Sequence, residues 1–338
     1  MGVSVSPRLR IAIRHPYFLA VIAGVVGAAL ICWVLVAGQD APPFALLAAA
    51  AVAPMAVLGV VWGRLGSEFP LKPLLIGAVV GPLVAILTYP VVAAFAFAFL
   101  YSFAESGRHL VESLRADPRL VSVLASPWVI LLLIEVVSVA PLTEEFGKAL
   151  GAAWARPRTR HEAFLFGVAA GVGFAIVENV LYATAAAIGG GPWPALAVAR
   201  SMGAAVHPLA TGLVMLGWWE WREGRGVGAL LKGYLSGVGI HALWNGTLVV
   251  VGVVEAIVAS NSGAPTYAPI ALSFTAVLGG VLAATLWFVA DAVASDHDPF
   301  ERFAFAQAQP IAIWTLVSAA LLVPVAVLVV VFPEFYHG

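Results

Sequence analysis

Long uninterrupted apolar stretches are the feature of this sequence that most restricts its fold. Each has about 20 residues or more, enough to cross the ~30 Å hydrocarbon core of a bilayer as a helix. Lipid offers the backbone no hydrogen-bond partner, and the stretches lack the alternation of barrel strands, so helices are expected. The stretches are 17–37, 44–62, 74–101, 121–151, 163–188, 195–219, 227–256, 269–290 and 311–332. The sequence therefore predicts an all-α, polytopic membrane helical bundle with about nine transmembrane helices.

The composition agrees with a membrane protein and excludes other classes. Hydrophobic residues make up 62% of the 338 residues and charged residues only 10%, whereas soluble domains have roughly 45–50% and about 25%. The formal net charge is −1, so no basic surface is expected to attract a nucleic acid. Cys32 is the single cysteine, which excludes an intramolecular disulfide and a cysteine-rich zinc site.

The basic residues are distributed unevenly between the predicted loops. Thirteen of the seventeen Lys and Arg residues fall on the side of the N-terminus, so the positive-inside rule places that terminus in the cytoplasm of a multi-pass cell-membrane protein. Nine crossings put the C-terminus outside the cell, and eight would put it in the cytoplasm. The first apolar stretch is longer than a signal-peptide core, which favours a retained helix over cleavage near Ala37.

The chain divides into three predicted regions. Residues 1–120 contain three transmembrane helices followed by a charged segment, 102–120. This segment is interpreted as an amphipathic extracytoplasmic helix or, alternatively, a solvated connector. Residues 121–256 form a central core of four helices, and residues 257–338 add two more.

Several ionisable residues interrupt the apolar stretches. An isolated charge at the centre of a membrane helix costs roughly 2.5–3.5 kcal/mol, so such residues usually face the bundle interior and mark a functional site. A rise of ~1.5 Å per residue places an acid or an imidazole of four consecutive helices near the middle of the bilayer. The seven residues are Glu135, Glu144, Glu145, Lys148, Glu178, His207 and His241. The shared depth of four helices predicts one polar site.

Residues one helical turn apart provide polar neighbours for these groups. Lys148 follows Glu144 by four residues, and Asn245 follows His241 by four. Such neighbours orient carboxylates and imidazole tautomers. Pro141 and Pro208 predict kinks that admit water, and the small residues of 167–173 predict close helix packing around the site.

Four motifs follow one another in the central core. They are Ala140–Lys148 (APLTEEFGK), Gly171–Tyr182 (GVGFAIVENVLY), His207 and His241–Asn245 (HALWN). Over residues 130–250 the chain resembles the PrsW family of intramembrane proteases, in a superfamily with the CAAX prenyl endopeptidases. The resemblance implies an endopeptidase that cleaves a membrane-anchored protein, and the family's association with anti-sigma factors suggests that substrate class. Glu178 stands where the sister family carries a histidine, so that family's catalytic scheme does not transfer intact.

Glu144 and Glu145 are the predicted acid–base pair. Two adjacent carboxylates in a poorly hydrated site do not readily both ionise, so one is expected to activate a water while the other orients it or shares its proton. Lys148 is expected to offset one negative charge. Glu135, further toward the outside, and Arg200, expected at the interface, are left out of the predicted site.

The two histidines have several predicted roles. His207 and His241 would polarise the scissile carbonyl, stabilise the oxyanion or, with Glu178, bind a divalent metal such as zinc. Metal-dependent and metal-free glutamate chemistry both stay open, because the short zinc signature His-Glu-x-x-His is absent. Asn245 is interpreted as an oxyanion donor or a ring-orienting group, with a structural link between helices as the alternative.

Two other functions fit buried Glu, Lys and His residues. A proton-coupled transporter also places such groups at the membrane midplane, but no inverted repeat is evident and the acids cluster in one block of four helices. A catalytically inactive scaffold is the second alternative. The sequence favours proteolysis, with a membrane-anchored protein and the lipid bilayer as partners and no nucleic acid.

Overall fold

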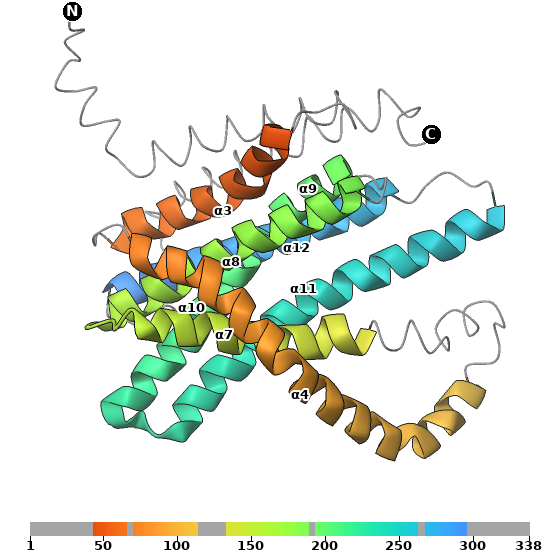
Figure 1. Cartoon of the computed structure of the whole chain (residues 1–338), viewed down its shortest axis with the longest axis horizontal. Coiled ribbons are helices and arrows are strands. Elements are labelled where there is room, and N and C mark those ends of the chain that lie inside the picture. The colour runs from red at the N-terminus through yellow and green to blue at the C-terminus, as the bar shows by residue number, and fades with distance from the viewer. Residues whose placement is uncertain (1–42, 66–69, 114–132, 189–192, 263–267, 296–338) are drawn as a thin grey trace, which may run out of the picture.

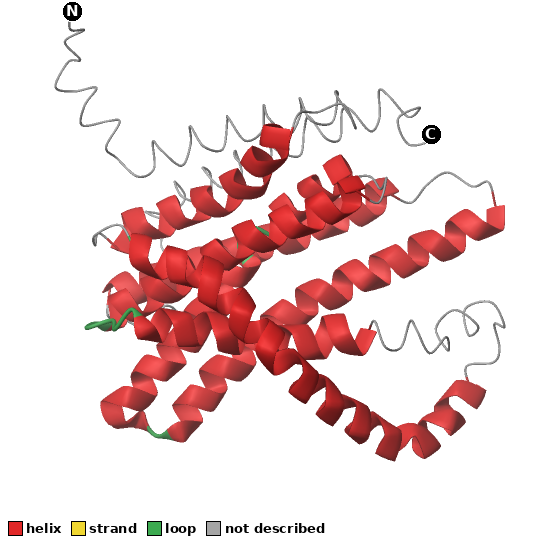
Figure 2. Ribbon diagram, in the orientation of Figure 1, coloured by secondary structure: helices red, strands yellow, loops and turns green. Residues whose placement is uncertain are grey.

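The computed structural model describes residues 43–65, 70–113, 133–188, 193–262 and 268–295, and their regular structure is helical throughout (Figure 2). The helices are α3 (Pro43–Leu65), α4 (Leu71–Ser113), the π-helix η2 (Glu135–Val139), α7 (Ala140–Trp154), α8 (Arg160–Ile188), α9 (Trp193–Met202), α10 (Val206–Glu220), the π-helix η3 (Trp221–Arg225), α11 (Val227–Ser262) and α12 (Ala268–Ser295).

The predicted membrane fold is confirmed as a class. Among the described helices, parts of α4, α8, α11 and α12 are long and apolar enough to cross a membrane. The first and last predicted spans, 17–37 and 311–332, lie outside the described residues. The total of nine crossings therefore stays a prediction.

Helix α8 lies at the centre of the bundle and packs against α3, α4, α7 and α10 (Figure 1). Its glycines permit this packing. A Cβ at Gly167 would lie 2.6 Å from the carbonyl oxygen of Thr211 in α10, and a Cβ at Gly173 would collide with the carbonyl oxygen of Leu74 in α4. The predicted close approach around 167–173 is thus confirmed, and it brings the backbones of α4 and α10 against two faces of α8.

The single helix predicted over 195–219 is wrong, because the chain turns between α9 and α10. The N–H groups of Ala204 and Val206 bond to carbonyls three residues earlier, at 3.2 and 2.9 Å. Gly203 lies against the indole of Trp244, where a Cβ would approach the ring closely. Pro208 then falls in the first turn of α10, where its missing N–H leaves no helical bond unmade.

Of the two interpretations of the segment 102–120, a helix and a connector, the helix agrees with the structure as far as Ser113. Helix α4 continues without a break to Ser113, and its prolines, Pro82 and Pro90, both lie earlier. Without a later proline, the helical hydrogen bonding runs past residue 101. Residues 114–120 lie outside the described part of the chain.

A π-helical turn leads directly into α7. The N–H of Ala140 bonds to the carbonyl of Glu135, five residues earlier. In the same register the carbonyl of Val136 would need the N–H of Pro141, which proline lacks. The side-chain amide of Asn245 in α11 donates to this carbonyl at 2.9 Å. Asn245 therefore joins α11 to the start of α7.

We expect Gly173→Ala to lower the free energy of unfolding in detergent by about 1–3 kcal/mol, the usual range for overpacking. Gly239→Ala is the matched control, because a Cβ at Gly239 in α11 meets open space. It should cause no loss, since alanine is the better helix former. Equal stability of the two variants would contradict the close packing of α8 on α4.

Candidate active site

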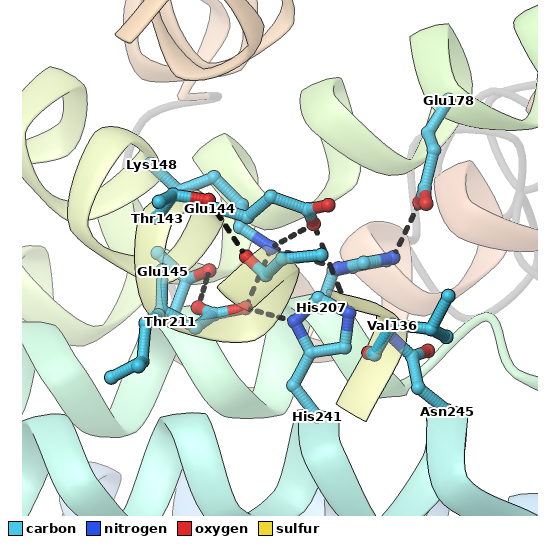
Figure 3. A network of polar contacts seen from close by, with 12 residues as sticks. Val136, Thr143, Glu144, Glu145, Lys148, Glu178, His207, Thr211, His241 and Asn245 are labelled. Carbon is cyan, nitrogen blue, oxygen red and sulfur yellow. Dashed lines mark hydrogen bonds and ion pairs between the residues drawn. The ribbon is translucent and has the colours of Figure 1, made fainter. Parts of the chain in front are cut away.

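Four helices bring their ionisable side chains to one place inside the bundle (Figure 3). Helix α7 carries two carboxylates and a lysine, α8 carries a third carboxylate, and α10 and α11 carry one histidine each. The imidazole centroids of His207 and His241 are 4.6 Å apart, with the rings edge to face. The predicted meeting of these groups in a single polar site therefore agrees with the geometry.

Lys148 lies at the centre of the site and is fully buried. Its ammonium donates to Glu145 Oε1 at 2.6 Å, lies 2.9 Å from His207 Nδ1, and is 3.5 Å from Glu144 Oε2. The same group lies 4.2 Å from the centroid of the Phe174 ring in α8, a cation–π contact. One cation thus offsets two adjacent carboxylates and joins three helices.

Glu145 is fully buried and has three hydrogen-bond partners. Besides Lys148, Thr211 Oγ1 in α10 donates to its Oε2 at 2.8 Å, and His241 Nδ1 lies 3.0 Å from its Oε1. An ionised carboxylate only accepts, so His241 carries its proton on Nδ1. The lone pair of His241 Nε2 is then available on the opposite edge of the ring.

Glu178 orients the imidazole of His207, as Glu145 orients that of His241. Its Oε2 lies 2.8 Å from His207 Nε2 and is also bonded to Arg200 in α9. Because a lysine ammonium only donates, His207 Nδ1 accepts from Lys148, and the ring proton resides on Nε2, facing Glu178. Arg200 also donates to the side-chain carbonyl of Asn179 at 2.8 Å, which fixes the position of Glu178.

Glu144 differs from its neighbour. Its side chain keeps 15% of its surface exposed, and its buried Oε2 has no hydrogen-bond partner. Glu144, His207 and His241 each offer a ligand atom within 4.8 Å of the others, the group of described residues suited to hold a metal ion. The sequence prediction had Glu178 as the carboxylate of this group. The structure places Glu178 behind His207 instead.

The donor set fits a divalent metal. One carboxylate and two imidazoles form a known zinc ligand set that leaves a position for water. A metal-binding imidazole usually donates its other N–H to a carboxylate, and Glu145 and Glu178 provide that partner for His241 and His207. The unpartnered oxygen of Glu144 agrees with a ligand role.

A groove of about 440 Å³ leads to the site between α4, η2, α7 and α8. Its wall is largely apolar and includes residues from all four elements. Among the lining residues are Ile86, Glu135, Glu144, Glu178 and Ala185. Of the two adjacent carboxylates in α7, the groove therefore reaches Glu144.

Sequence reasoning missed two participants. Arg200, expected at the membrane interface, pairs with Glu178, and its guanidinium lies 4.9 Å from the ring of Tyr182. The signal that could have identified Arg200 is its place as a basic residue in an apolar helix, together with Glu178, an acid with no nearby cation in its own helix. Glu135, placed outside the site, lines the same groove as Glu144. Asn245 bonds to the backbone carbonyl of Val136, which agrees with the alternative predicted for it, a structural link between helices.

A helical membrane bundle with a carboxylate–imidazole cluster at the end of an apolar groove has the features of a membrane-embedded hydrolase. Residues 42–278 match the family described as PrsW family intramembrane metalloprotease. The chain therefore belongs to the PrsW family and is an intramembrane endopeptidase. The match extends the resemblance over 130–250 to α3 and α4 and gives no support to a transporter. No curated protein and no solved structure matches the chain.

Removing the cation from the site should destabilise the fold. We expect Lys148→Met to lower the free energy of unfolding by about 3–5 kcal/mol, because it leaves buried Glu145 without its partner. Adding Glu145→Gln should recover part of the loss. Unfolding in mixed detergent micelles, followed by tryptophan fluorescence, measures both effects.

Lys232→Met is the matched control, since Lys232 is exposed on α11. Exposed substitutions usually change stability by less than about 0.5 kcal/mol. A Lys148→Met protein as stable as this control would contradict the role of the buried ammonium.

Proposed function

We propose that this endopeptidase hydrolyses a peptide bond of a membrane-anchored protein at the cluster of Glu144, His207 and His241. The observation that carries the proposal is that ligand atoms of these three residues, from three helices, lie within 4.8 Å of one another. Each imidazole is backed by a carboxylate outside the cluster. Such an arrangement is costly in an apolar bundle and is suited to catalysis.

We assign the three residues to a divalent metal, with zinc as the ion that best matches the ligand types. Such an ion supplies Lewis-acid activation of a water and of the scissile carbonyl. His241 provides Nε2, and Glu144 provides a carboxylate oxygen. His207 provides Nδ1, which accepts from the Lys148 ammonium in this structure, so the ion would replace that ammonium as the partner of Nδ1. Glu145 and Glu178 hold the rings of His241 and His207 in the tautomers that this role requires.

Glu144 is also the proton acceptor in this scheme. It is the carboxylate of the α7 pair that borders the groove. One of its oxygens would bind the ion, and the other would accept the proton. A carboxylate in this position takes the proton of the attacking water and passes it to the leaving amine. Both oxygens of Glu145 already accept hydrogen bonds from the protein, so its role is to position His241.

The groove receives the substrate as an extended segment. Helical carbonyls are already hydrogen-bonded, so the scissile bond must leave its helix, and its freed N–H and C=O groups then need partners inside the membrane. Pro90 in α4 has no N–H for the carbonyl of Ile86, four residues earlier in the helix. Ile86 lines the groove. Its backbone carbonyl can therefore accept a hydrogen bond from the extended substrate.

The proposal includes a class of substrate and a membrane topology for this endopeptidase. The family resemblance suggests a membrane-anchored anti-sigma factor as the protein that is cleaved. The distribution of basic residues favours a chain with its N-terminus in the cytoplasm and about nine crossings. Three tryptophans, Trp218, Trp219 and Trp221, lie at the end of α10 and the start of η3, where interfacial indoles are expected.

Replacing the cluster residues one at a time should abolish cleavage. We expect Glu144→Gln and His241→Gln each to reduce processing of a co-expressed single-span substrate by at least about 100-fold, because each removes a group acting on the reacting atoms. Immunoblotting of the membrane fraction measures the processed fragment and the amount of enzyme together.

Glu223→Gln and His161→Gln are matched controls, since they change the same residue types outside the site. Both should cleave at the wild-type rate. Wild-type processing by Glu144→Gln or His241→Gln would overturn the proposed cluster, provided that the variant accumulates in membranes as the controls do.

The role of the groove in substrate binding can be tested without changing a residue of the cluster. Ala185 lines the groove, and its neighbour Thr184 is exposed but lies outside the groove lining. We expect Ala185→Trp to lower kcat/KM by about tenfold or more, because an indole occupies the space that the substrate needs. Thr184→Trp, which adds the same indole one residue earlier, should leave the rate unchanged. Equal rates for both variants would show that the substrate reaches Glu144 by another route.

A further inference from the structure

A second cavity lies at the basic end of the bundle, away from the active-site groove. It has a volume of about 810 Å³ and forms where the start of α4, the α7–α8 connection, the start of α8 and the end of α10 meet. The α7–α8 connection and the turn after α10 both appear at the left-hand end of the molecule (Figure 2). This cavity shares no lining residue with the active-site groove.

Positive charge dominates the lining. Four basic residues, Lys72, Arg156, Arg158 and Arg222, face one carboxylate, Glu162. That carboxylate is already engaged at the start of α8, where its Oε2 accepts from the backbone N–H of Arg158 at 2.6 Å. Among the described residues, no carboxylate forms an ion pair with Lys72, Arg156 or Arg158. The cavity therefore holds an excess of cations without matching anions.

The backbone holds part of this arrangement in place. Two residues after the end of α7, Arg156 adopts the left-handed region, at a φ of 60°, and its N–H bonds to the carbonyl of Ala153 at 2.9 Å. Arg222 donates to the carbonyl of Pro157 at 3.1 Å and lies 5.5 Å from the ring of Trp218. Guanidinium groups gathered in this way suit the oxygens of a phosphate.

The surroundings favour a lipid as the source of that phosphate. Trp218 and Phe166 add aromatic surface to the cavity. Leu71 and Leu75, beside Lys72 on α4, expose 52% and 56% of their surface, which suits contact with acyl chains. Basic pockets between membrane helices, at the level of interfacial tryptophans, are suited to anionic headgroups.

We propose that the cavity formed by Lys72, Arg156, Arg158 and Arg222 binds the phosphate-bearing headgroup of an anionic phospholipid. The four residues come from the beginning of α4, the α7–α8 connection and the π-helix η3 that follows α10. A bound headgroup therefore joins the helices that also form the frame of the active site. Binding does not require turnover and can be measured separately from cleavage.

Native mass spectrometry of the full-length protein in detergent tests the proposal, with phosphatidylglycerol as the probe and phosphatidylcholine as the neutral comparison. The Kd for phosphatidylglycerol should rise about thirtyfold in Arg156→Gln/Arg158→Gln and about fivefold in Lys72→Gln, because each basic residue contributes roughly fivefold to anionic-lipid binding. The control Arg225→Gln/Lys232→Gln removes the same charge at the same end of the molecule and should stay within about twofold.

Three results would overturn the proposal. One is equal binding of phosphatidylcholine and phosphatidylglycerol. Another is an Arg156→Gln/Arg158→Gln protein that binds phosphatidylglycerol as tightly as the control variant, with Lys72→Gln also unchanged. The third is displacement of phosphatidylglycerol by inorganic phosphate at a similar concentration, which would reject the lipid and assign the cavity to a soluble phosphate.

Discussion

The buried ammonium of Lys148 is the contact on which the arrangement of the central helices depends. It lies within hydrogen-bond distance of Glu145 and His207 and against the ring of Phe174, so it joins α7 to α10 and α8. Glu145 extends the network to α11 through His241. In an apolar bundle an unpaired charge is expensive, so the helices pack stably only where these groups meet. The cost of burying charge thus determines the position of the site.

The adjacent carboxylates Glu144 and Glu145 have different surroundings because successive residues of a helix point about 100° apart. Glu145 faces the interior, where both its oxygens accept hydrogen bonds. Glu144 lines the groove, and its buried Oε2 has no hydrogen-bond partner. The first can orient an imidazole, and the second is available to the substrate. The two histidines are also oriented by carboxylates, since one nitrogen of each contacts a carboxylate outside the cluster. This separation allows a compact site to hold charged groups with distinct roles.

The sequence predicts much of this structure, because burying a charge in lipid costs so much free energy that the few charged residues within apolar stretches indicate where the helices must meet. The helical class, the meeting of Glu145, Glu178, His207 and His241, and the close packing around 167–173 all follow from that constraint. It does not reveal which carboxylate faces a histidine and which faces the groove, since that depends on how each helix is rotated. Arg200 was missed because its partner lies on another helix. The role of Asn245 depends on a π-helical register that leaves the carbonyl of Val136 opposite Pro141, and no sequence pattern specifies that register.

X-ray absorption spectroscopy of the purified full-length protein loaded with zinc tests the central claim most directly. The account predicts one ion per chain with only nitrogen and oxygen ligands, at about 2.0–2.1 Å, including two imidazoles, and loss of that spectrum when His207 is replaced by Gln. A chain that binds no ion, or one whose imidazole signature survives the loss of His207, would contradict a metal centre formed by Glu144, His207 and His241.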